Sequence, residues 1–229
     1  MTSFNKDTIE PSEKFEIIED KNNPAHKKGF HKPTIALTEK MFHEYIDAMT
    51  KGGCGFRANP KIVTALIIEG MLGIRISDVL KLRLSSIVQD GERKRLDIVE
   101  KKTKKVKTHT VPEPVYQFIK DYCDKNNIGW DEPIIKCKTR NIQTYINKVT
   151  DYLGYSDYEK NYTISTHSFR KFFGTSVYYN NEHDIVLVQQ LYQHANIDTT
   201  RKYINVSDPR VDKALEKQVE LAGNLLSGK

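Results

Sequence analysis

The sequence has three cysteines, one tryptophan and no long hydrophobic run. Cys54, Cys123 and Cys137 are far apart and lack the spacing of a metal site, so we expect reduced thiols rather than a disulfide framework or a zinc ribbon. No stretch approaches the ~18 apolar residues that a membrane helix needs, and the polar N-terminus does not resemble a signal peptide. Acidic residues do not cluster as a two-metal nuclease would require. These absences favour a soluble cytoplasmic protein with neither a membrane nor a metal as partner.

Positive charge is the main feature of an otherwise globular composition. The chain has 229 residues, of which 38% are hydrophobic and 29% charged, enough for one large domain or two small ones with a real core. Its 36 Lys and Arg exceed its 30 Asp and Glu, although residues 1–24 carry three lysines against six acidic residues. Residues 92–107 hold eight basic and three acidic residues. Such a run attracts a polyanion, although a solvated surface is the commoner explanation for a charge run taken alone.

The chain is predicted to be mostly helical, with one small antiparallel sheet. Residues 1–33 lack a sustained apolar period and are expected to form a polar arm or linker. Apolar spacing and turn residues predict helices that run from Thr38 to Gly52, from Pro60 to Gly73, and near 113–126, 139–153, 166–180, 184–193, 198–205 and 209–223. Asn59, Asp184 and Asp198 are the expected N-caps of three of them. Alternating residues predict strands near 84–89, 95–100 and 106–111, joined by Asp90-Gly91 and by the lysine-rich segment 101–105.

Three short patterns place ionisable side chains at the ends of predicted helices. GIRISDVLKL puts Arg75 at a junction between two helices, and STHSFRKFFGTS puts His167 and Arg170 on one helical face. LYQHANIDTTRKY puts His194 nine residues before Tyr203. Each pattern is weak alone, because its residue types are common in this chain. The alternatives are a loop cap for Arg75, helix-terminus roles for both histidines, and a core position for Tyr203.

Together and in this order, the patterns resemble the catalytic domain of the tyrosine recombinases, the phage integrase family. That family has an arginine in a G-x-R-x-S-[DE] context, a basic hairpin, an H-x-x-R helix, and an L-x-x-H motif followed by a tyrosine. The matching residues are Gly73, Arg75, Ser77 and Asp78; the hairpin lysines with Thr110, Val111 and Pro112; His167 and Arg170 with Phe169 and Gly174; and Leu191, His194, Thr199, Thr200 and Tyr203. At Gln193 the chain departs from the glycine that relatives usually have. The resemblance implies a catalytic domain over 34–206, mainly α with a small antiparallel β-sheet.

The resemblance also implies a site-specific recombinase that cleaves and rejoins DNA through a 3′-phosphotyrosine, without metal or ATP. Tyr203 would be the nucleophile, Arg75 and Arg170 would hold the phosphate, His167 would act as acid or base, and His194 would hydrogen-bond the phosphate. Physical chemistry agrees, because guanidiniums grip phosphate oxygens bidentately. A phenol, with its reference pKa of about 10, needs only a modest electrostatic shift or a base to become phenolate.

A hairpin lysine would protonate the departing 5′-oxygen. Lys102 is our candidate, because Lys102-Thr103 resembles the K-T sequence often found there, and Lys104 is the substitute if the register slips. The lysines expected to contact DNA are Lys101, Lys104, Lys105 and Lys107. For each of these lysines, a non-specific phosphate contact is the alternative.

The implied partners are double-stranded DNA and further copies of the chain, which would form a tetramer on DNA. Accessory DNA-binding proteins are additional candidates, and no cofactor is implied. Residues 1–33 are too few for the clamping domain of about a hundred residues that many members carry, so either this is a short protein or a partner supplies the clamp. The tail helix expected over 207–229 would pack on its own domain or on a neighbouring protomer. The alternative functions are a type IB topoisomerase-like relaxing enzyme and a non-catalytic DNA-binding module.

Overall fold

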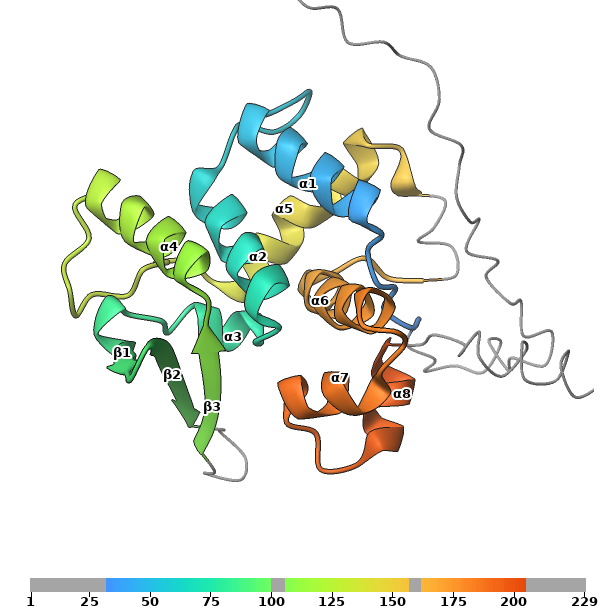
Figure 1. Cartoon of the computed structure of the whole chain (residues 1–229). Coiled ribbons are helices and arrows are strands. Elements are labelled where there is room, and N and C mark those ends of the chain that lie inside the picture. Colours follow the sequence, from blue (N-terminus) through green and yellow to red (C-terminus); the bar gives the residue numbers. More distant parts are fainter. Residues whose placement is uncertain (1–31, 100–105, 157–161, 205–229) are drawn as a thin grey trace, which may run out of the picture. The chain divides into compact units, whose positions relative to one another are not determined.

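The computed structural model describes residues 32–99, 106–156 and 162–204. The elements are α1 (Glu39–Lys51), α2 (Pro60–Leu72), α3 (Ile76–Val79), the 3₁₀ turn η1 (Leu84–Ser86), β1 (Ile87–Asp90), β2 (Arg93–Val99), β3 (Val106–Val111), α4 (Glu113–Lys125), α5 (Thr139–Tyr152), α6 (Thr166–Asn180), α7 (Ile185–Tyr192) and α8 (Ile197–Ile204). The predicted class, mainly α with a small antiparallel sheet, is confirmed (Figure 1). The predicted hairpin tip, the tail helix and almost all of the arm fall outside the described residues.

Local signals set the ends of the first two helices, as the sequence predicts. The hydroxyl of Thr38 caps the first turn of α1, and the side chain of Asn59 caps that of α2. Pro60 occupies the start of α2, where no backbone N–H is needed. Gly73 ends α2 in the left-handed conformation, with φ 61°, which glycine adopts at little cost.

The centre of the fold is α2, which packs against α1, α3, α4 and α6. Most of its side chains are buried, as expected of a helix that is apolar all round. Phe169 of α6 is fully buried and makes edge-to-face contacts with the rings of Phe42 and Tyr45 on α1. Helix α1 and the start of α6 are thereby held in one core.

The sheet has the strand order β1-β2-β3, and both pairs are antiparallel. Strand β1 begins at Ile87, three residues after the predicted start, because residues 84–86 form η1 and bury Leu84 there. Gly91, with φ 59°, lies in the turn between β1 and β2, as predicted. Leu96 of β2 pairs with His109 of β3, which fixes the face on which each β3 side chain lies.

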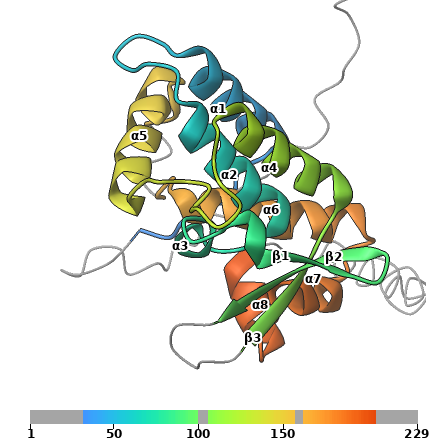
Figure 2. The same cartoon turned by 90° about the vertical axis from the view of Figure 1, so that its left-hand side faces the viewer.

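Helices α7 and α8 form a second cluster with the end of α6. Its buried residues are Tyr178, Val188, Tyr192 and Ile204. Asp184 caps α7 as predicted, with its carboxylate accepting from the N–H groups of Val186 and Leu187. The expectation for Asp198 is wrong: α8 begins at Ile197, Asp198 lies in its first turn, and the side chain of Asn196 accepts from the N–H of Asp198. Figures 1 and 2 show this cluster beside β3.

No helix in the described part of the chain is both long and apolar enough to cross a membrane.

Candidate active site

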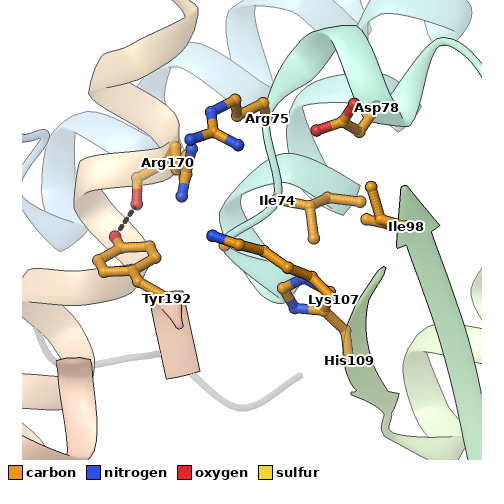
Figure 3. Close-up of a pocket in the computed structure, with 9 residues that line it drawn as sticks. Ile74, Arg75, Asp78, Ile98, Lys107, His109, Arg170 and Tyr192 are labelled. Atoms are coloured by element: carbon orange, nitrogen blue, oxygen red, sulfur yellow. Dashed lines mark hydrogen bonds between the residues drawn. The ribbon is translucent and has the colours of Figure 1, made fainter. Parts of the chain in front are cut away.

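Three elements that are distant in the sequence surround one small pocket (Figure 3). They are the junction between α2 and α3, the strand pair β2 and β3, and helix α6, and the end of α7 closes one side. The lining residues are Gly73, Ile74, Arg75, Asp78, Ile98, Lys107, His109, Arg170 and Tyr192. The fold thus brings Arg75, Lys107 and Arg170, all predicted from the sequence as site residues, to one place.

The backbone around Arg75 is held from two sides. Its carbonyl oxygen accepts from the N–H groups of Asp78 and Val79, so Arg75 is the N-cap of α3. The N–H of the next residue, Ile76, donates to Oε1 of Glu69 at 3.0 Å. Glu69 is fully buried, and burial raises the pKa of its carboxyl, against the opposing effects of the Ile76 hydrogen bond and the charge of Arg170. The hydrogen bond to this buried carboxyl fixes the stretch of backbone from which the side chain of Arg75 extends.

Arg170 is a buried cation in the second turn of α6. Its side chain is 5% exposed, and its Nε atom has no hydrogen-bond partner among the described residues. Its Cζ atom lies 5.0 Å from the ring centre of Tyr192 and 5.4 Å from that of Tyr203. Buried polar groups are almost always hydrogen-bonded, so an unsatisfied guanidinium N–H beside a pocket suits an anionic ligand that supplies the acceptor.

Strand β3 contributes two side chains on one face, Lys107 and His109. Nζ of Lys107 donates to the backbone oxygen of Gln193 at 3.1 Å. The pKa of His109 is lowered to about 4, chiefly by burial and then by the charges of Arg170, Lys107 and Arg75. Sequence reasoning missed His109. Strand alternation, which places it on the same face as Lys107, could have found it.

His194 and Tyr203 do not line the pocket, but the rings of both pack against Tyr192, which does. Nδ1 of His194 shares a hydrogen bond of 3.0 Å with Oγ1 of Thr200. The rings of His194 and Tyr203 are 5.8 Å apart, and the ring of Tyr192 lies 5.2 Å from each. Burial, followed by the charges of Arg170, Lys107 and Arg75, lowers the pKa of His194 to about 4. His109 and His194 are therefore uncharged near neutral pH.

The hydroxyl of Tyr203 is covered. Its oxygen is buried without a hydrogen-bond partner among the described residues, and the charged ends of Arg170 and Lys171 each lie 5.4 Å from its ring centre. Burial raises the pKa of the phenol, Glu69 adds to the effect, and Arg170 and Arg75 oppose it. In this arrangement burial outweighs the two guanidiniums, so the electrostatics of the site alone do not favour phenolate and a base remains the other route.

The remaining predicted residues stand apart from the pocket or cannot be placed. His167 is exposed in the first turn of α6 and is not one of the described residues that line the pocket. Partial loss of hydration lowers its pKa, as do the charges of Arg170, Arg75 and Lys171. Lys101, Lys102, Lys104 and Lys105 lie outside the described residues.

Cys54, Cys123 and Cys137 are free cysteines. In the described segments, no group of three or more His, Cys, Asp or Glu side chains is arranged to hold a metal ion.

Comparison with protein families matches residues 36–210 to the Phage integrase family. The chain therefore belongs to the phage integrase family, which the sequence motifs predicted. It is similar to the tyrosine recombinase XerH of Campylobacter jejuni, with 24% identity over 203 residues, 86% of this chain and 55% of XerH. It is also similar to the tyrosine recombinase XerA of Pyrococcus furiosus, with 25% identity over 90% of this chain and 68% of XerA.

Solved structures share the fold. The XerH recombinase bound to its difH substrate, in a pre-cleavage complex, matches with a TM-score of 0.60 and 15% identity, over 81% of this chain and 55% of that one. The catalytic domain of bacteriophage HP1 integrase matches with a TM-score of 0.54 and 14% identity, over 80% of this chain and 94% of that domain. The chain thus spans about half the length of XerH and nearly all of an isolated catalytic domain.

Proposed function

We propose that this chain is the catalytic part of a site-specific DNA recombinase, with Tyr203 as its nucleophile. The observation that carries the proposal is the convergence of Arg75, Lys107 and Arg170 on one pocket, with the ring of Tyr203 packed against Arg170. A scissile phosphodiester is an anion that gains negative charge on its non-bridging oxygens during attack. Fixed cations aimed at those oxygens stabilise the transition state more than the ground state.

The reaction replaces one phosphodiester bond by another. The phenolic oxygen of Tyr203 attacks phosphorus, its proton passes to a base, and the bond from phosphorus to the 5′-oxygen breaks. The departing oxygen takes a proton and leaves as a 5′-hydroxyl, while the 3′ end stays on the tyrosine. Because a phosphodiester is conserved, a 5′-hydroxyl from the same or another strand can reverse the step without ATP or a metal.

Roles for the other residues follow from charge and position. Arg75 and Arg170 would grip the non-bridging oxygens, since guanidiniums keep their charge at any working pH. His194, uncharged before binding, would hydrogen-bond the phosphate, and the pKa of its ring would rise next to that anion. His167 is retained as a candidate acid or base. Lys102 is retained as the proton donor to the 5′-oxygen, with Lys101, Lys104, Lys105 and Lys107 as DNA contacts.

The covered hydroxyl of Tyr203 adds one requirement. Its oxygen must reach phosphorus, so α8, which carries it, has to shift or turn when DNA binds. The partner would be double-stranded DNA, with further copies of the chain completing a tetramer.

A test is covalent capture on nicked duplexes of randomised sequence, which trap the protein once cleavage has released a short strand. We expect an adduct that survives SDS and EDTA with the wild type and disappears with Tyr203→Phe, while that variant still binds DNA. Sequencing the captured DNA then gives the target site. An adduct with Tyr203→Phe would place the nucleophile elsewhere. Loss of the wild-type adduct in EDTA would contradict metal independence. No adduct under any condition would favour a DNA-binding module without catalytic activity.

A further inference from the structure

We propose that Tyr192 is a positioning residue of this site, which sets the relative placement of Arg170, His194 and Tyr203. The inference rests on the function proposed above. It concerns a residue that the sequence motifs leave unassigned, between Leu191 and His194.

Among the described residues, Tyr192 contacts all three of these groups. Its hydroxyl donates to the backbone oxygen of Arg170 at 2.6 Å, the interaction drawn in Figure 3. Its ring is stacked on that of His194, with an interplanar angle of 25°, and meets the ring of Tyr203 edge-on at 78°. The guanidinium of Arg170 lies 5.0 Å from its centre. One rigid ring therefore touches a phosphate-binding cation, an imidazole and the proposed nucleophile.

The hydrogen bond has a fixed direction. Tyr192 is 1% exposed, and burial raises the pKa of its phenol far above the ordinary value, so the hydroxyl stays protonated and acts as donor. The acceptor belongs to the backbone of α6, the helix that carries Arg170. This bond ties the end of α7, and with it His194, to the helix of the cation.

Gly174 makes room for this arrangement. A β-carbon at position 174 would lie 2.4 Å from the Tyr192 hydroxyl oxygen and 2.6 Å from its Cε2 atom, so any larger residue displaces the ring. Gly174 lies inside α6, where glycine is less favourable than alanine by roughly 0.5–1 kcal/mol. The close approach of the tyrosine explains why glycine stands there.

The experiment compares Tyr192→Phe and Tyr192→Leu with Tyr178→Phe, a control in the same buried cluster. The ring of Tyr178 contacts the rings of Tyr179 and His183. On the captured DNA sequence, we expect the rate of adduct formation to fall up to about tenfold with Tyr192→Phe, which loses one hydrogen bond. It should fall on the order of a hundredfold with Tyr192→Leu, which loses the ring that aligns the site. DNA affinity should stay near that of the wild type, and Tyr178→Phe should react at the wild-type rate.

A second readout does not depend on activity. The ring of Tyr192 covers one face of His194, so removing it should raise the pKa of that imidazole from about 4 towards 6.5, measured by NMR titration. Arg170, Lys107 and Arg75, the cations that also lower this pKa, remain in the variant. If the wild type forms no adduct, the proposed function fails, and this titration still decides whether Tyr192 shapes the site.

A mutant cycle separates positioning from general stability. Gly174→Ala should slow adduct formation by itself, because it displaces the Tyr192 ring. Adding Gly174→Ala to Tyr192→Leu, which frees that space, should cost little more. Additive effects of the two changes, wild-type rates for the Tyr192 variants, or losses that merely follow the folded fraction would each overturn the proposal. Tyr192→Phe and Gly174→Ala keep the test decisive if Tyr192→Leu does not fold.

Discussion

The side-chain amide of Gln193 donates a hydrogen bond to the backbone oxygen of Thr108, 2.6 Å away, across 85 positions of sequence. Gln193 ends α7 in the left-handed conformation, with φ 52°. Its own backbone oxygen accepts from Lys107. Relatives usually have glycine at this position. Here Gln193 connects the pair of helices α7 and α8, of which α8 carries Tyr203, to strand β3, which carries Lys107.

Replacing Gln193 should separate the backbone effect from the amide effect. Gln193→Ala keeps the left-handed strain and loses the bond to Thr108, so we expect the free energy of unfolding to fall by roughly 1 kcal/mol. Gln193→Gly loses the same bond but relieves the strain, so it should unfold closer to the wild type. Urea denaturation measures both. A glycine variant less stable than the alanine variant would contradict the assignment.

Arg170→Ala should depress cleavage far more than DNA binding. The contact of Arg170 with the phosphate strengthens as charge develops, so we expect adduct formation to slow on the order of 10²- to 10³-fold. Single-turnover capture gives the rate, and a filter or gel-shift titration gives the affinity. The matched control is Arg201→Ala on α8, an exposed arginine paired with Asp198, which should cleave at nearly the wild-type rate. Equal losses in rate and affinity with Arg170→Ala would reduce it to an ordinary phosphate contact.

Stability should decrease as the pH falls from 7 towards 4. The folded state holds His109 and His194 uncharged down to a pKa of about 4, whereas the unfolded chain takes up protons near 6.5. The unfolded state therefore binds more protons over this window and is favoured by acid. Thermal unfolding at pH 7 and pH 5 should show a smaller difference in Tm for His109→Gln and His194→Gln than for the wild type. Variants that keep the full difference would show that other groups cause the acid sensitivity.

Local signals predicted the helices well, because each acts within one turn of the chain. Thr38, Asn59 and Gly73 set helix ends through bonds to nearby backbone or through their own φ preference. The start of β1 was misplaced, since alternation alone does not distinguish a strand from the 3₁₀ turn that buries Leu84. At Asp198, two polar residues two positions apart are candidates for the cap, and Asn196 holds it.

For the site, the sequence named some of the residues that meet but not how they are covered. Arg75, Arg170 and Lys107 line one pocket, whereas His167 does not. The burial of the Tyr203 hydroxyl depends on Tyr192 and α6, which are distant contacts that no spacing rule reports. The exposure of His167 likewise depends on how α6 meets the rest of the fold.

The pocket draws its cations from the start of α3, from β3 and from α6, and the ring of Tyr203, which packs against Arg170, comes from α8. During synthesis, a nascent chain that has emerged only through β3 displays Arg75 and Lys107 without the partner that would join them, and the phenol arrives last. A fragment that ends before α6 therefore carries Arg75 and Lys107 but lacks both Arg170 and Tyr203.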